Sequence, residues 1–370
     1  MNRFRAARPV VAAGILLTAG APALSACTVP HMTLAYASEL VTCGGKTELK
    51  ASGSTAQAHA MVEFADVYRS ACVDRTVDYS ANGSGAGIAD FLAGETDFAA
   101  SDSPLNAEQR ARAKQRCGGS DAWHLPIVFG PMAITYNLPD VDSLVLDAPT
   151  IAKIFSGNIS RWDDPDLVAL NGPLPDQEIR VVYRSDLSGS TENFQAYLHA
   201  ASGGVWDKEA DKTFNGGVGV GAKGNEGTAA LVRTTEGAIS YNELAFAMDQ
   251  GLFAAEIKTP ASRKSKRPVR IGTDSVGKTI AGAKITGTGN DLVVDISSFY
   301  NPTEGDVYPI VLAGYEIVCS KYPDPVVGQA VKGFLQAAAG LGQASLNKQG
   351  YIPLPPDFQS RVWTAIEAIA

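Results

Sequence analysis

Residues 181–198 read VVYRSDLSGSTENFQAYL and contain a short apolar run, a polar turn and the start of a helical repeat. The run at 181–183 predicts a buried strand, and the apolar residues after position 193 recur at helical spacing. The turn at Ser188 and Gly189 therefore lies at a helix N-terminus. Unpaired backbone N–H groups and the positive end of the helix dipole favour an anion there.

Two charged residues flank this turn. Arg184 offers a planar fork that matches a tetrahedral oxyanion, and Asp186 is close enough to hold that fork in one orientation. Ser, Thr and Gly before a helix also occur simply as helix caps, so this stretch taken alone leaves both interpretations open.

The same arrangement occurs twice more. ASGSTAQ at 51–57 places Ser54 and Thr55 before a helical pattern, and NGSGAGIADFLAG at 82–94 places Ser84 at the turn. This repetition favours an anion-binding protein. DFAASDSPL at 97–105 then predicts a short strand ending at Asp102, which is either a helix cap or a carboxylate among the donors.

Composition sets the outer limits. The chain has 370 residues, 45% of them hydrophobic and 19% charged, which is enough for two domains and too apolar for disorder. Strand and helix signals alternate after residue 46, so we expect an α/β fold.

The N-terminus predicts export. Three arginines precede an apolar run at 10–17 that is too short to span a membrane, which is typical of a secretory signal. The ending LSAC at 24–27 resembles a bacterial lipobox, in which residues 1–26 are removed and the thiol of Cys27 carries a diacylglycerol. An ordinary export signal is the alternative. Residues 27–46 then form a polar tether that reaches about 25 Å.

Without residues 1–26 the chain has 28 basic and 39 acidic residues, a balance of −11. An acidic protein must bind an anion through local donors rather than through its overall field. We therefore expect no nucleic-acid partner.

Seven strings follow one another in a characteristic order: ASGSTAQ, NGSGAGI, TDFAASDSPL, GPMAITYNL, ISRWDD, YRSDLSGSTENF and GAKGNEG. In this order the chain resembles the PstS family, the phosphate-binding proteins of bacterial Pst transporters, and most of all its actinobacterial lipoprotein members. The resemblance covers about residues 48–370. It implies a two-lobe periplasmic-binding-protein type II fold with the ligand cleft between the lobes, and delivery of phosphate to Pst permease subunits served by a separate ATPase.

The resemblance also implies a set of phosphate-binding residues from the three turns, the aspartate and the arginine. By position these are Ser54, Thr55, Ala56, Ser84, Asp102, Arg184, Ser188, Gly189 and Ser190, with Asp186 pairing with the arginine. Many relatives have Phe where Ala56 stands and Thr where Ser190 stands. A backbone N–H serves in the first case and a hydroxyl remains in the second, so binding should be retained.

Asp102 is the predicted selectivity filter. Phosphate near neutral pH carries a proton that an ionised carboxylate can accept, whereas sulfate has none and would meet charge repulsion. Sites that pair a buried polar group can reject an analogue without its partner by about 10⁴ to 10⁵ fold.

The family resemblance predicts a first lobe at 47–128 and 308–370 and a second lobe at 129–307.

Four cysteines remain in the exported chain, Cys43, Cys72, Cys117 and Cys319, and they allow three pairings. We favour Cys72–Cys117 with Cys43–Cys319, since each pair would lie within or beside one lobe. Zinc is the alternative, although no CxxC or paired histidine accompanies them, so we expect no metal and no cofactor.

Three other features need an interpretation. GVGAKG at 219–224 matches a dinucleotide pattern, but without a convincing strand before it we expect a loop preceding a helix at 227–233. The basic stretch 262–270 is expected to be a solvated loop, with docking to an anionic surface as the alternative.

A secreted phosphatase on the same fold would use Ser84 or Ser188 as nucleophile, but no GxSxG or histidine accompanies them, so we expect no enzyme.

Overall fold

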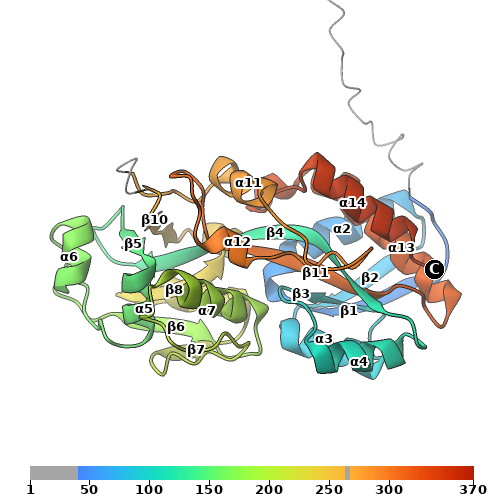
Figure 1. Cartoon of the computed structure of the whole chain (residues 1–370), viewed down its shortest axis with the longest axis horizontal. Coiled ribbons are helices and arrows are strands. Elements are labelled where there is room, and N and C mark those ends of the chain that lie inside the picture. Colours follow the sequence, from blue (N-terminus) through green and yellow to red (C-terminus); the bar gives the residue numbers. More distant parts are fainter. Residues whose placement is uncertain (1–40, 263–266) are drawn as a thin grey trace, which may run out of the picture.

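The structure is a computed structural model and describes residues 41–262 and 267–370. Figure 1 shows an elongated α/β body with helices and strands gathered toward both ends and the long strand β4 (Ala122–Asn137) running through the middle. The predicted α/β class is confirmed. Cys27, most of the tether and residues 263–266 of the basic stretch lie outside the described residues.

One sheet runs through the molecule in the order β2-β1-β3-β11-β4-β8-β6-β7, with β9 paired to β4, and a small separate sheet joins β10 to β5. Their remaining bounds are β1 (Glu48–Gly53), β2 (Thr76–Ser80), β3 (Phe98–Ser101), β5 (Val145–Asp147), β6 (Arg180–Arg184), β7 (Val220–Ala222), β8 (Ala238–Glu243), β9 (Phe253–Ala254), β10 (Glu256–Lys258) and β11 (Val311–Cys319).

Strand β4 changes partner along its length. It pairs antiparallel with β11 up to Pro131 and with β8 from Met132 onward. We call the elements around β2-β1-β3-β11 the first lobe and those around β8-β6-β7 the second lobe. Pro131 lies at the change of partner, where a sheet tolerates a residue without an N–H donor. The residue boundaries predicted for the lobes stay a prediction.

Helices on both faces of its strands form the core of the first lobe. In α2 the residues at helical spacing are buried, and Tyr68 meets Phe334 edge-on at 5.8 Å between ring centroids. Phe334 also stacks on Phe98 of β3 at 5.2 Å, so the helices are anchored to the sheet. These helices are α2 (Ala58–Ala71), α3 (Ser84–Ala93), α4 (Ala107–Arg116), α13 (Pro325–Ala339) and α14 (Pro356–Glu367).

An aromatic cluster holds the second lobe together. Phe194 of α7 stacks on Tyr241 of β8 at 4.3 Å and meets Phe155 edge-on at 4.7 Å. The remaining helices are α5 (Ala148–Phe155), α6 (Pro165–Asn171), α7 (Gly189–Ala201), α8 (Gly224–Thr234), α9 (Leu244–Asp249), α11 (Thr273–Ala281) and α12 (Ser297–Tyr300), with the 3-10 turns η1 (Thr55–Gln57), η2 (Leu341–Gln343) and η3 (Leu346–Gln349).

The GVGAKG stretch contains a strand that the sequence did not reveal. Strand β7 occupies Val220–Ala222 and pairs in parallel with β6, and α8 begins two residues later at Gly224. Only three residues long and partly exposed, β7 lacks the apolar run by which buried strands are predicted. The expected loop before the helix is therefore wrong.

The favoured disulfide pairing is also wrong. The bonds are Cys43–Cys72 and Cys117–Cys319, with Cα atoms 5.4 and 5.5 Å apart. Cys117 ends α4 and Cys319 ends β11, and the pairing of Ala122 with Cys319 across the sheet brings these two ends together. That register is a long-range feature, which the spacing of cysteines cannot reveal.

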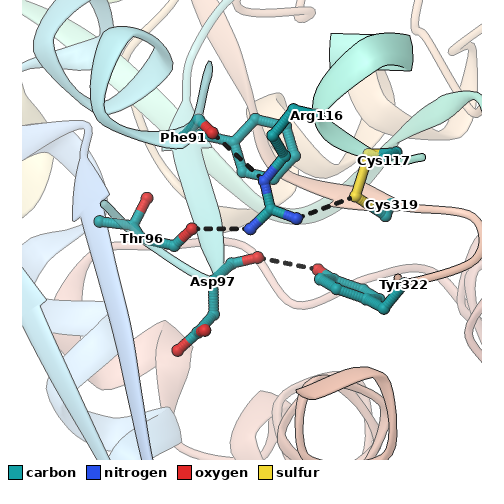
Figure 2. The surroundings of a disulfide bond; sticks show 7 residues. All are labelled: Phe91, Thr96, Asp97, Arg116, Cys117, Cys319 and Tyr322. Carbon is teal, nitrogen blue, oxygen red and sulfur yellow. Dashed lines mark hydrogen bonds between the residues drawn. A yellow bond between two sulfur atoms is a disulfide. The ribbon is translucent and has the colours of Figure 1, made fainter. Parts of the chain in front are cut away.

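Arg116 secures the second of these disulfides (Figure 2). Its guanidinium donates to the carbonyl oxygens of Phe91 at 3.2 Å and Thr96 at 2.9 Å and contacts the sulfur of Cys319 at 3.3 Å. The same group lies 4.6 Å from the Phe91 ring centroid, a cation–π distance. One side chain thus joins α3, α4 and the end of β11.

The C-terminus lies at the first-lobe end of the molecule (Figure 1), where the first described residues also pack. The N–H of Thr42 donates to the side chain of Gln336 on α13, and the N–H of Tyr322 donates to the carbonyl of Ala370. Among residues 41–262 and 267–370, no helix has the length and apolar character that crossing a bilayer requires.

Candidate anion-binding site between the lobes

Asp102 is the centre of the site. It follows β3, it is buried, and each carboxylate oxygen accepts a hydrogen bond. Ser54 Oγ donates to Oδ1 at 2.5 Å, Gln57 Nε2 approaches the same oxygen at 3.4 Å, and Ser190 Oγ donates to Oδ2 at 3.2 Å. Because Ser190 belongs to the second lobe, the carboxylate is held from both sides.

Three helix beginnings surround this carboxylate. Ser54 caps η1, which leads directly into α2; Ser84 is the first residue of α3; and Ser188 caps α7. All three serines are almost fully buried. Helix N-termini present unpaired N–H groups and a positive dipole end, so their convergence creates a positive potential without a net positive charge. The structure thus brings the three predicted turns together.

Gly189 allows a close approach between the lobes. A Cβ atom at this position would lie 2.6 Å from Ser84 Oγ and 2.8 Å from Asp102 Cβ, which is closer than real side chains come. Ser84 Oγ also accepts the backbone N–H of Asp102 at 3.2 Å. Only glycine lets the start of α7 pack against these two residues.

Arg184 ends β6, and its side chain is 1% exposed. Its Nε donates to Asp186 Oδ1 at 2.8 Å and its Nη2 to Oδ2 at 2.5 Å, the paired arrangement that the sequence predicts. Burial opposes ionisation of Asp186, but the hydrogen bonds and charge of Arg184 outweigh it and lower the pKa of the carboxyl. No hydrogen bond among the described residues uses Arg184 Nη1, so the pair leaves this donor for a ligand.

Thr55 and Ala56 both lie in η1 and are buried. The Thr55 hydroxyl accepts hydrogen bonds from the backbone N–H of Asn225 at 3.2 Å and from its side chain at 3.0 Å. The N–H of Ala56 donates to Ser54 Oγ at 3.1 Å. The first turn thus touches the start of α8 as well as Asp102.

Burial raises the pKa of Asp102 above its ordinary value, although the hydrogen bond from Ser54 and the charge of Arg184 act in the opposite direction. A carboxylate of raised basicity among hydroxyl and amide donors can accept a proton from an acidic ligand group. The site therefore suits an oxyanion that carries a proton.

Several residues of this region escaped the sequence analysis. Asn193 donates to the carbonyl of Asp102, and Asn225 holds Thr55 from within the GAKGNEG string, whose members received no individual role. Glu316 is fully buried in β11. A lone glutamate in the apolar run 308–322 was the available signal, because an acid in a buried strand needs a reason to be there.

No histidine is hydrogen-bonded to the residues of this site in the described part of the chain. No group of His, Cys, Asp and Glu there could hold a metal ion. His124 is buried and serves the fold, since its Nδ1 lies 2.6 Å from Asp291 Oδ1 and its Nε2 accepts the N–H of Leu105.

A hollow of about 510 Å³ lies elsewhere. It is mostly apolar and lies along the second lobe between Ile154, Val182 and Leu231. Its charged residues, Glu178 and Arg180, are exposed at the surface. Because oxyanions need buried convergent donors, the Asp102 cluster is the better candidate.

Two lobes joined through a shared strand, with buried oxyanion donors between them, define the class of two-lobe substrate-binding proteins. The chain matches the family model described as the PBP superfamily domain over residues 29–338. It is 55% identical over 378 residues to phosphate-binding protein PstS 3 of Mycobacterium tuberculosis, covering 100% of both chains. It is also 55% identical to PstS 2 of the same organism, covering 97% of this chain and 98% of that one. The chain therefore belongs to the PstS family of phosphate-binding proteins.

Solved structures agree on the fold. A high-affinity periplasmic phosphate-binding protein of the DING type, bound with phosphate, superposes with a TM-score of 0.69 at 21% identity, covering 86% of this chain and 93% of that one. A phosphate-bound transporter substrate-binding protein from Clostridium perfringens gives 0.60 at 17% identity, covering 83% of this chain and 100% of that one. These likenesses confirm the predicted type II two-lobe fold.

Proposed function

We propose that this protein binds inorganic phosphate with high affinity around Asp102 and delivers it to the permease of a Pst-type ABC transporter, whose ATPase is a separate subunit. The observation that carries the proposal is the buried carboxylate held from both lobes, with Ser54 on one oxygen and Ser190 on the other. The relatives at 55% identity are named phosphate-binding proteins, which supports the same ligand.

The chemistry of the site explains how phosphate would be selected. Arg184 and the N-termini of α3 and α7 supply donors for the unprotonated oxygens, and charge-assisted hydrogen bonds contribute about 1.5–3 kcal/mol each. Asp102 accepts the remaining proton of phosphate. Sulfate offers no proton, so one of its oxygens would face the carboxylate unpaired, which is costly in a buried site.

We propose binding without catalysis. Neither Ser84 nor Ser188 is hydrogen-bonded to a histidine among the described residues, so neither has the base that activates a nucleophilic serine. Ser188 instead caps α7 and Ser84 supports the backbone of Asp102. A secreted phosphatase on the same fold remains the alternative that the assay below tests.

We further propose that Cys27 carries a lipid and holds the protein on the extracytoplasmic face of the cell membrane. The described chain begins at Val41 beside α13 in the first lobe. A tether there would leave the region between the lobes away from the anchor. Metabolic labelling with a fatty acid, compared between the full chain and Cys27→Ala, tests this proposal.

Calorimetric titration of the purified protein with phosphate, sulfate and arsenate tests the ligand. We expect tight binding of phosphate and of protonated arsenate and no detectable binding of sulfate. Equal affinity for sulfate would contradict the role of Asp102. Hydrolysis of p-nitrophenyl phosphate above the rate of a Ser84→Ala/Ser188→Ala control would favour the phosphatase.

A further inference from the structure

Glu316 is a buried acid that the binding mechanism does not use. It lies in β11 between Ala100 of β3 and Leu125 of β4, and its exposed fraction is 0%. Neither of its carboxyl oxygens has a hydrogen-bond partner among the described residues. A buried carboxylate that accepts no hydrogen bond is unstable as an anion. Glu316 is therefore favoured in its protonated, neutral form.

Gln57 has a buried acceptor that lacks a donor. Its Nε2 points toward Asp102 Oδ1 at 3.4 Å, and its Oε1 is buried without a partner in residues 41–262 and 267–370. The carboxylate of Asp102 requires a donor, which fixes the orientation of the amide and leaves Oε1 as an acceptor in need of a hydrogen. A proton on Glu316 that is donated to Gln57 Oε1 would therefore give both buried groups a hydrogen-bond partner.

The strand geometry directs both side chains to one region. The β11–β4 register shifts between Gly314 and Tyr315, but the extra residue, Ile127, belongs to β4. Strand β11 therefore keeps its alternation, and Glu316 leaves the sheet on the same face as Gly314. A Cβ atom at Gly314 would lie 2.8 Å from Gln57 Cδ, which shows that Gln57 covers this face of β11. Tyr79 reaches the same turn, since its hydroxyl donates to the carbonyl of Ser54 at 2.5 Å.

We propose that Glu316 is a positioning residue of the phosphate site: as a neutral acid it donates a hydrogen bond to Gln57 Oε1 and so holds Gln57 Nε2 toward Asp102. This inference rests on the proposed function. The neutral form has a second effect, because an ionised Glu316 would add a negative charge near Asp102 and the bound anion. Burial raises the pKa of Glu316 well above its ordinary value, and the charge of Asp102 acts in the same direction.

Three variants test the proposal against phosphate and sulfate by calorimetry. Glu316→Gln keeps the size and a neutral N–H donor, so we expect phosphate affinity within about threefold of wild type. Glu316→Leu removes the donor, and we expect about tenfold weaker phosphate binding and a lower phosphate-to-sulfate ratio. Ile317→Val, the next residue of β11 and on its other face, controls for disturbance of the strand and should change neither value.

A double variant locates the effect. If Glu316 acts through Gln57, adding Glu316→Leu to Gln57→Leu should weaken phosphate binding no further than Gln57→Leu alone. Additive losses would overturn the proposal, as would wild-type affinity in Glu316→Leu or equal losses in the Leu and Gln variants. Failure of the wild type to bind phosphate would instead reject the proposed function.

A spectroscopic readout applies even if Glu316→Leu does not fold. The infrared carbonyl stretch of a protonated carboxyl group should be present in the wild type at neutral pH and weaker in Glu316→Gln. Equal intensity in the two proteins would show that Glu316 is ionised and would overturn the proposal.

Discussion

The side-chain amide of Asn193 donates to the carbonyl oxygen of Asp102 at 2.7 Å and to that of Gly189 at 2.8 Å. Asn193 lies on α7 in the second lobe, whereas Asp102 follows β3 in the first. This amide therefore ties the lobes together beside the site. A ligand that contacts both lobes favours the closed form, and such ties add to its stability.

Asn193→Ala should weaken phosphate binding by about tenfold, because one buried interlobe hydrogen bond contributes about 1–1.5 kcal/mol. The loss should appear mainly as faster dissociation, which stopped-flow displacement of phosphate measures. Asn301→Ala is the matched control, since Asn301 also donates to a carbonyl of α7 but is exposed. An unchanged dissociation rate in Asn193→Ala would show that the tie is irrelevant to binding.

Asp102→Asn should weaken phosphate binding and lower the phosphate-to-sulfate affinity ratio. The neutral amide oxygen accepts the phosphate O–H more weakly than a carboxylate does, and the amide no longer repels a fully ionised oxyanion. Because burial raises the pKa of Asp102, the wild type should also lose phosphate affinity as the pH falls through that pKa, whereas the variant should not. Calorimetry across the acidic range checks both effects. An identical ratio in the two proteins would remove Asp102 from the selectivity mechanism.

In Gly189→Ala, the loss of phosphate-binding free energy should exceed the loss of unfolding free energy. The added methyl would press on Ser84 and Asp102 and hold the lobes apart. Gly277→Ala in α11 is the control, because a Cβ atom there meets nothing within 4 Å. An alanine inside a helix should raise stability by up to about 1 kcal/mol. Equal phosphate affinities in the two variants would contradict the close contact of Gly189 with Ser84 and Asp102.

Glu243→Gln should stabilise the protein at alkaline pH. Glu243 is fully buried, its Oε2 caps α9 through the N–H of Ala245, and its Oε1 has no partner in the described part of the chain. Burial raises the pKa of this carboxyl well above its ordinary value. The folded state keeps the proton while the unfolded chain releases it, so stability is full below the ordinary glutamate pKa and is lost as the pH rises toward the folded value.

The glutamine variant cannot lose this proton. Its advantage over wild type should therefore grow by about 1.4 kcal/mol per pH unit between the two pKa values of Glu243. Urea unfolding at pH 4, 6 and 8 measures it. Parallel stability curves for the two proteins would mean that Glu243 is ionised in the folded state.

Loss of Cys117–Cys319 should destabilise the protein more than loss of Cys43–Cys72. The sequence separations are 202 and 29 residues, which correspond to about 5 and about 3.5 kcal/mol of loop entropy in the unfolded chain. Urea unfolding of paired Cys→Ser variants measures the difference, and non-reducing peptide mapping checks the connectivity. A linkage between Cys72 and Cys117 would refute the structure in this region.

Local signals in the sequence were enough to predict the three turns, because each helix N-terminus is marked by its own capping residue. Ser54, Ser84 and Ser188 each stand where a short strand gives way to a helix, as their spacing predicts. The pair of Arg184 and Asp186 lies within one turn of chain, and it too was predicted correctly.

The sequence by itself therefore determined the α/β character, the caps and the residues available to hold an anion, since these depend on neighbours a few positions apart. Only the tertiary structure decided which disulfides form, that Asn193 joins the lobes, and that Glu316 lies beside β3, the strand that leads to Asp102. Of these, the Cys117–Cys319 bond and the position of Glu316 depend on the pairing of β11 with β3 and β4, strands far apart in the sequence. A shift of one residue in that register would turn Glu316 to the opposite face of the sheet, so no local pattern could have revealed its position.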